Sequence, residues 1–305
     1  MLSLIDTHHH FLDPRAHYYP WLNDAGAPPH RYGDHAALKR PYLPADYRRD
    51  TAGVNLVGSV HVEADWDPKD PIGEMRFIAA LREECGLPSV AVGQAWLHQG
   101  DAASTLEQLA AFDFVRGVRQ KPRANLAPGG PPGGMTDPAW LQGYARLEPL
   151  GLHYELQTPF WHLHEAARVA SGFPGTQIVI NHAGMPSDRS EEGMRAWRSA
   201  LAGMAAHPNV AIKISGIGEA GYQWRFDANR RVVREVIDLF GVDRCMFGSN
   251  YPLDSLCTSY QAIFDAFASY VADVSAEEQA RLFVENARRI YRIAPSRLAG
   301  QGRKQ

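Results

Sequence analysis

The chain has 305 residues, a formal net charge of -3 and a hydrophobic content of 45%. This length suits one large domain with a substantial core, or two modest domains. The small net charge, with no block of like charges, argues against nucleic acid or an anionic membrane surface as a partner, so we expect a small-molecule partner. The composition leaves a homo-oligomer open.

The cysteines and the N-terminus indicate a cytoplasmic protein. Cys85, Cys245 and Cys257 lie far apart and form no C-x-x-C spacing, so we expect neither a disulfide framework nor a thiolate zinc site. The N-terminus lacks a basic segment followed by a continuous apolar run, and no apolar stretch reaches the roughly eighteen residues of a membrane span.

Short apolar runs alternate with segments of helical period along the chain. We predict strands at 4–10, 55–63, 89–96, 114–119, 152–157, 177–182, 209–215 and 244–249. We predict helices at 46–53, 74–85, 102–111, 139–150, 162–171, 193–206, 229–240, 259–272 and 275–291, the last opened by a capping box from Ser275 to Glu278. Residues 11–46 are rich in proline and aromatic side chains, so we expect a packed loop that walls a pocket, with Tyr19 and Trp21 as candidate substrate contacts.

This alternation of strands and helices predicts an α/β protein with a single (β/α)8 TIM barrel over residues 1–293. Residues 294–305 form a basic tail that we expect to be frayed. No Gly-x-Gly-x-x-Gly or Gly-Lys-Ser/Thr motif follows a predicted strand, which disfavours a nucleotide-binding open sheet.

The first strand carries the strongest chemical signal. Strand alternation places Asp6, His8 and His10 on one face. His182 ends another apolar strand, and the carboxyl ends of barrel strands share one rim, so three imidazoles are expected to meet there. Three imidazoles with an open position are typical of a catalytic zinc site, whereas each histidine alone could equally be structural. An expression tag is the other interpretation of residues 8–10, which their place inside an apolar strand disfavours.

Charged residues at other strand ends extend the candidate site. Lys213 alternates with branched residues and is expected to point into the barrel, where it needs an anionic partner, or else to reach solvent at the barrel mouth. Arg119 and Arg123 bracket the start of the fourth loop and suit a carboxylate or lactone oxygen, with surface salt bridges as the alternative. Glu63 and Glu155 are candidate site carboxylates only because strand alternation places them on the inward face. We expect each to pair with a buried cation and not to act as a catalyst.

Together these motifs resemble the amidohydrolase superfamily, specifically its lactonase branch, which includes 2-pyrone-4,6-dicarboxylate lactonase and sugar-acid lactonases. The resemblance spans nearly the whole chain and rests on residues 5–11, 19–22, 117–119, 181–184, 213–216 and 246–252. It implies a barrel hydrolase that acts on a lactone, with His8, His10 and His182 at the reaction centre. It also implies that Arg119 and Arg123 hold a substrate carboxylate or carbonyl.

Two departures from the branch pattern matter. The usual Asp after the eighth strand is Asn250 here, and an amide cannot accept a proton near neutral pH, so Asp254 or Glu63 becomes the candidate base. The fifth strand ends in Gln157 where many metal-dependent members have histidine, which disfavours a two-metal centre. One divalent ion, zinc first, held by His8, His10 and His182, or no metal at all, are the two alternatives.

The resulting hypothesis is water attack on the carbonyl of a small carboxylated or sugar-acid lactone. Arg119, the imidazoles or their metal would stabilise the oxyanion, while Asn250 stands in the place of the base. Candidate substrate contacts also include Lys213, Glu63 and Gln157. A lactone isomerase or a decarboxylase on the same barrel, and a non-catalytic binding protein, are the competing interpretations.

Overall fold

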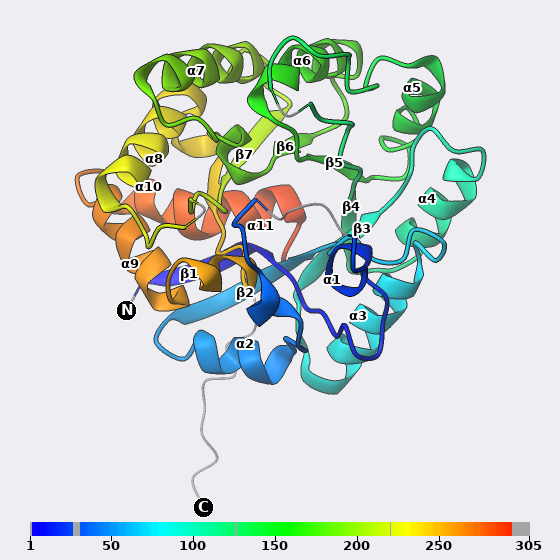
Figure 1. Cartoon of the computed structure of the whole chain (residues 1–305), viewed down its shortest axis with the longest axis horizontal. Coiled ribbons are helices and arrows are strands. Elements are labelled where there is room, and N and C mark those ends of the chain that lie inside the picture. The colour runs from blue at the N-terminus through cyan, green and yellow to red at the C-terminus, as the bar shows by residue number, and fades with distance from the viewer. Residues whose placement is uncertain (1, 27–30, 126, 220, 295–305) are drawn as a thin grey trace, which may run out of the picture.

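Eight parallel strands form one sheet that curls into a barrel (Figure 1). The computed structural model describes residues 2–26, 31–125, 127–219 and 221–294, so the predicted tail at 294–305 lies outside the described residues from position 295 on. The strands follow chain order around the sheet: β1 Ser3–His9, β2 Asn55–Val62, β3 Val90–Gln94, β4 Val115–Arg119, β5 His153–Leu156, β6 Ile178–Ile180, β7 Val210–Ile214 and β8 Cys245–Phe247. The predicted (β/α)8 barrel is confirmed.

The ring closes between β1 and the segment that follows β8. The His10 N–H donates to the Tyr251 carbonyl at 2.7 Å, and the Asn250 N–H donates to the His8 carbonyl at 2.6 Å. These bonds bring the first and last predicted site motifs together at one rim of the barrel.

Most helices surround the sheet as an outer layer, while the last one, at 286–291, crosses the middle of the barrel view (Figure 1). The helices are α1 Pro20–Asn23, α2 Pro44–Asp50, α3 Gly73–Cys85, α4 Ala102–Ala110, α5 Pro138–Tyr144, α6 Leu163–Gly172, α7 Glu191–Ala205, α8 Phe226–Phe240, α9 Tyr260–Tyr270, α10 Ala276–Ala280 and α11 Asn286–Tyr291. A π-helical segment, Arg281–Glu285, joins α10 to α11, and the predicted capping box from Ser275 to Glu278 is present. Within the described ranges, none of the helices combines the length and apolarity needed to cross a bilayer.

The apolar pattern explains why the strands are buried on both faces. Every residue of β7 is buried, because the barrel interior covers one face and the helices cover the other. On α8, the buried positions Val232, Val233, Val236, Ile237 and Phe240 recur at helical spacing and face the sheet.

The long loop after β1 is packed, as expected. Tyr19 is fully buried, with its ring centroid 5.3 Å from that of Trp66. The Trp21 indole donates to the Ala64 carbonyl at 2.8 Å, just beyond β2. The loop is thereby fixed to the rim of the barrel where β2 ends.

Candidate active site

Three histidine rings meet at the carboxyl rim of the barrel. The ring centroids of His8 and His10 lie 5.0 Å apart, and those of His8 and His182 lie 4.5 Å apart. His8 belongs to β1, His10 follows it directly, and His182 lies two residues beyond the end of β6. The predicted convergence of these imidazoles is therefore observed.

Asp6 does not join them, and the prediction that it shares their face is wrong. Its carboxylate accepts hydrogen bonds from the Ser249 hydroxyl at 2.7 Å and from the Tyr47 and Tyr260 hydroxyls on α2 and α9. A register shift between Asp6 and His9 interrupts the alternation of β1. Asp6 therefore links β1 by hydrogen bonds to α2, to α9 and to the segment after β8.

The imidazoles are held neutral. Burial is the main cause that lowers the pKa of His8, His10 and His182 well below its ordinary value, and nearby cations lower it further. His10 Nδ1 lies 2.7 Å from the Val62 carbonyl, which can only accept, so Nδ1 carries the proton and Nε2 presents a lone pair. Both ring nitrogens of His8 are buried without a hydrogen-bond partner.

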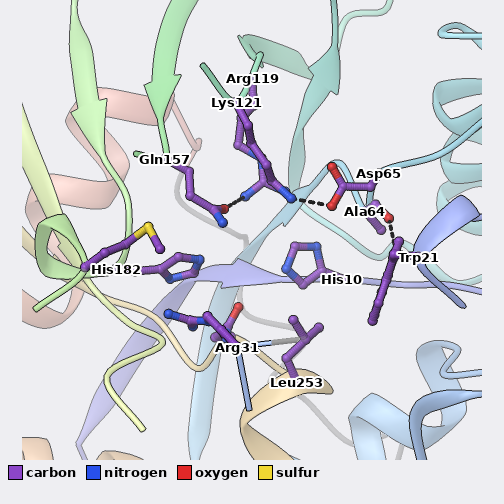
Figure 2. A pocket seen from close by; sticks show the side chains of 12 residues that line it. His10, Trp21, Arg31, Ala64, Asp65, Arg119, Lys121, Gln157, His182 and Leu253 are labelled. Carbon is purple, nitrogen blue, oxygen red and sulfur yellow. Dashed lines mark hydrogen bonds and ion pairs between the residues drawn. The ribbon is translucent and has the colours of Figure 1, made fainter. Parts of the chain in front are cut away.

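A cavity of about 310 Å³ opens onto this cluster (Figure 2). Pockets of this size hold a small molecule. Its lining includes six of the predicted site residues, His10, Trp21, Arg119, Gln157, His182 and Asn250, together with Arg31, Ala64, Asp65, Lys121, Met185 and Leu253.

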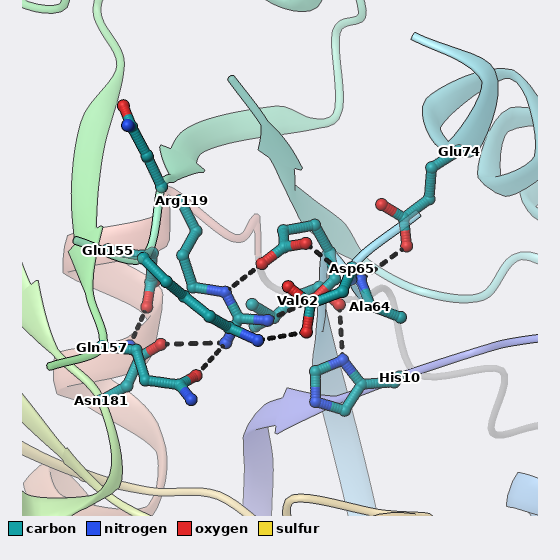
Figure 3. Close-up of polar contacts among 12 residues, drawn as sticks. His10, Val62, Ala64, Asp65, Glu74, Arg119, Glu155, Gln157 and Asn181 are labelled. Atoms are coloured by element: carbon teal, nitrogen blue, oxygen red, sulfur yellow. Dashed lines mark hydrogen bonds and ion pairs between the residues drawn. The ribbon is translucent and has the colours of Figure 1, made fainter. Parts of the chain in front are cut away.

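Arg119 is the central cation of the cavity wall (Figure 3). Its Nε donates to the Glu63 carboxylate and its Nη2 to the Glu63 carbonyl. Its Nη1 donates to Gln157 Oε1 at 2.8 Å and to Asn181 Oδ1 at 3.3 Å. A guanidinium has five N–H donors, so these four bonds leave one Nη2 donor for a ligand.

A second ion pair lies deeper in the barrel. Lys213 Nζ lies 2.9 Å from Glu155 Oε2, and both side chains are fully buried, which confirms that Lys213 points inward to an anionic partner. Burial lowers the pKa of Lys213 to about 8. Burial alone would raise the pKa of Glu155, but Lys213 and His153 lower it to about 2. The Asn181 amide donates to Glu155 and thereby links this pair to Arg119 (Figure 3).

Asn250 lies in the cavity wall with a defined orientation. Its φ of 56° is left-handed, a conformation that asparagine tolerates better than most residues. Its Nδ2 donates to Asp254 Oδ1 at 2.6 Å, so Oδ1 is the free end of the amide, and Oδ1 has no hydrogen-bond partner. Asp254 also accepts from the Tyr32 hydroxyl at 2.7 Å, and burial raises the pKa of Asp254 to about 6.

Several predicted site residues lie away from the cavity wall. Asp254 is bonded to Asn250, Glu63 to Arg119, and Lys213 to Glu155. Tyr19 packs against Trp66. Arg123 has a side chain that is 78% exposed, pairs with Asp137 at 3.5 Å and lines a different cavity.

Three charged residues of the cavity wall were not predicted. Lys121 forms an ion pair with Asp65. Lys121 lies two residues after Arg119, and residues two apart on a strand face the same side, so the sequence could have predicted its place beside Arg119. Arg31 comes from the long loop, where no periodicity indicates which side chain turns toward the barrel.

The donor types suit a metal ion, but their arrangement does not form a metal site. Neutral imidazoles with bare nitrogens are zinc ligands. The His10 Nδ1 bond to a backbone carbonyl is also the contact that typically orients a metal-binding histidine. Over the described ranges, no group of three or more His, Cys, Asp or Glu side chains is placed to hold an ion.

Comparison with known proteins agrees with this geometry. The amidohydrolase family model matches residues 5–293. The chain belongs to this family. The uncharacterized protein y4mH of Sinorhizobium fredii is 37% identical to this amidohydrolase over 96% of the chain and 99% of that protein.

Two further relatives are informative about chemistry. An L-fucono-1,5-lactonase of Burkholderia ambifaria is 27% identical over 96% of the chain and 97% of that protein. A solved amidohydrolase from Burkholderia multivorans with bound zinc is 26% identical, with a TM-score of 0.79, over 96% of the chain and 100% of that structure. The expectation of an amidohydrolase-type hydrolase, with lactonases among its relatives, is confirmed.

Proposed function

We propose that this amidohydrolase opens the ring of a small sugar-acid or carboxylated lactone by water attack. The observation that carries the proposal is the joint placement, in one cavity wall, of the His10 imidazole, whose Nε2 has a lone pair, and Arg119, which keeps one N–H donor free. The L-fucono-1,5-lactonase relative supports the substrate class.

We assign the role of general base to His10, in place of Asp254 or Glu63. Its Nε2 presents a lone pair to the cavity, because Nδ1 is committed to the Val62 carbonyl. Asp254 and Glu63 do not line the cavity and are occupied by Asn250 and Arg119.

The proton and bond changes balance without another reactant. The water oxygen bonds to the lactone carbonyl carbon as His10 Nε2 takes a proton. The remaining Nη2 donor of Arg119 stabilises the oxyanion. The bond between the carbonyl carbon and the ring oxygen then breaks, and His10 returns the proton to that oxygen. The product is an open-chain hydroxy acid that releases one proton at neutral pH.

Binding of a metal ion at the three histidines is a separate proposal. His8, His10 and His182 would have to move from the positions seen here to hold one divalent ion, zinc first, and the ion would then supply polarisation of the carbonyl. Metal analysis of the purified protein, with turnover measured before and after chelation, tests this proposal apart from the side-chain roles.

The decisive experiment is a pH-indicator screen of neutral and carboxylated sugar lactones with mass analysis of the products. We expect a product heavier than the substrate by one water. A product of equal mass would indicate an isomerase, and loss of carbon dioxide a decarboxylase. His10→Gln should lower kcat by about two to four powers of ten, as expected for removal of a general base.

A further inference from the structure

Residues 61–64 form one short segment that contacts both side chains of the proposed reaction. The Val62 carbonyl accepts a hydrogen bond from His10 Nδ1 at 2.7 Å (Figure 3). The next residue, Glu63, binds Arg119 through its carbonyl and through its carboxylate. The positions of the general base and of the oxyanion donor therefore depend on how firmly this segment is held.

Glu74, on α3, contacts both ends of the segment. Its Oε1 accepts from the Ala64 N–H at 2.8 Å and lies 3.3 Å from His61 Nε2. His61 Nδ1 accepts from the Phe11 N–H at 3.1 Å, so Nδ1 carries no proton. Burial lowers the pKa of His61 to about 3. The ring is therefore neutral, and its Nε2–H donates to Glu74.

The same contacts reach the main chain that carries His10. The His10 N–H donates to the Tyr251 carbonyl at 2.7 Å, and the N–H of the next residue, Phe11, donates to His61. Glu74 orients the His61 ring that accepts this second bond. Glu74 therefore supports both the backbone beside His10 and the strand end that orients its ring.

These contacts of Glu74 use a single carboxylate oxygen. Glu74 and His61 are both fully buried, and Glu74 Oε2 has no hydrogen-bond partner. In the part of the chain that the structure describes, no lysine or arginine forms an ion pair with Glu74. An amide oxygen can accept the same two hydrogen bonds, so glutamine can replace this carboxylate, whereas leucine cannot.

We propose that Glu74 is a positioning residue for the lactone-opening reaction. It holds residues 61–64 in place, and that segment orients His10 and Arg119. This inference rests on the proposed function. It implies that removal of the accepting oxygen slows the chemical step, because a displacement of about 1 Å can lower the rate about a hundredfold.

Steady-state kinetics of three variants test this role. Glu74→Leu should lower kcat about tenfold to a hundredfold and change KM less than about threefold. Glu74→Gln should keep kcat within about threefold of the parent, because it retains the accepting oxygen. In a His10→Gln background, Glu74→Leu should lower kcat by a smaller factor than in the parent, because Glu74 acts partly through His10. Equal factors in the two backgrounds, or equal losses in Glu74→Leu and Glu74→Gln, would overturn the proposal.

Glu165→Leu is the matched control. Glu165 also lies in the first turn of a helix, α6, where its Oε1 accepts from the Gly133 N–H at 2.7 Å and lies 2.9 Å from His162 Nδ1. Neither Gly133 nor His162 lines the first cavity, the one of about 310 Å³ beside the histidines. This variant should keep kcat within about threefold of the parent. A fall as large as in Glu74→Leu would overturn the proposal, because loss of any such carboxylate would then be sufficient.

Amide hydrogen exchange tests the contacts without turnover. In Glu74→Leu, the Ala64 and Phe11 amides should exchange about tenfold faster relative to the amides of β6, the scale of one lost hydrogen bond. In Glu74→Gln they should stay protected. If the parent hydrolyses no lactone, the proposed function fails, while the exchange rates still decide whether Glu74 holds the segment. Unchanged exchange at Ala64 in Glu74→Leu would overturn the inference.

Discussion

Replacing Arg119 with methionine separates its role in the reaction from its role in the fold. The side chain is 2% exposed and so is its partner Glu63, so the variant leaves a buried carboxylate without its cation. Such a loss costs about 3–5 kcal/mol in the free energy of unfolding. It also removes the donor for Gln157 and Asn181, which adds to the cost.

The double variant Arg119→Met/Glu63→Gln should restore much of that stability, because it no longer buries an unpaired charge. It should not restore turnover, because the oxyanion still lacks its guanidinium donor. We expect kcat to fall by about two to three powers of ten in both variants. The assays are urea unfolding followed by circular dichroism, and pH-indicator turnover at a temperature where every variant is folded.

Arg116→Met is the matched control, because Arg116 lies on the same strand and its Nε donates to the Tyr291 carbonyl at 2.9 Å, away from the cavity. It should alter stability and leave turnover intact. The reasoning is refuted if Arg119→Met retains turnover within about threefold of the parent. It is equally refuted if the double variant recovers turnover, since the loss would then come from Glu63 and the fold.

Three further outcomes are expected. Asn250→Leu should lower the free energy of unfolding by about 1–3 kcal/mol, because buried Asp254 loses the hydrogen bond from Asn250 Nδ2; urea unfolding would contradict this if the change were less than about 0.5 kcal/mol. The raised pKa of Asp254, about 6 against an ordinary 3.8, means that its ionisation destabilises the folded state as pH rises from about 4 to about 6. The free energy of unfolding should therefore fall less between pH 4 and pH 6 in Asp254→Asn than in the parent protein. An equal fall in both proteins would contradict the raised pKa of Asp254. If an ion binds the three histidines, chelation should lower both turnover and the melting temperature, and added zinc should restore both. The metal proposal is wrong if elemental analysis finds no metal and chelation leaves turnover unchanged.

Periodicity predicted the parts of the site that belong to strands. Lys213 could be placed inside the barrel because its strand alternates regularly, and an isolated ammonium there must find an anion. The three histidines could be placed together because parallel barrel strands end at one rim. Asp6 was misplaced because a register shift in β1 leaves no mark in a single sequence.

Loop residues followed no such rule. Arg31 reaches the cavity from a long loop, whereas Arg123, two residues beyond Lys121, turns toward solvent. A loop side chain's direction depends on backbone turns and on contacts made after folding, so neither position could be assigned from spacing. The orientation of the Asn250 amide could not be predicted from the sequence either, because it depends on the hydrogen bond to the buried Asp254.

The imidazoles beside the first cavity are neutral because burial and the neighbouring cations both lower their pKa. Arg119, Lys121 and Lys213 each contact a carboxylate, so the excess positive charge that would favour tight binding of a dianion is largely cancelled. A neutral ring carbonyl is the group that such a cavity accommodates at least electrostatic cost.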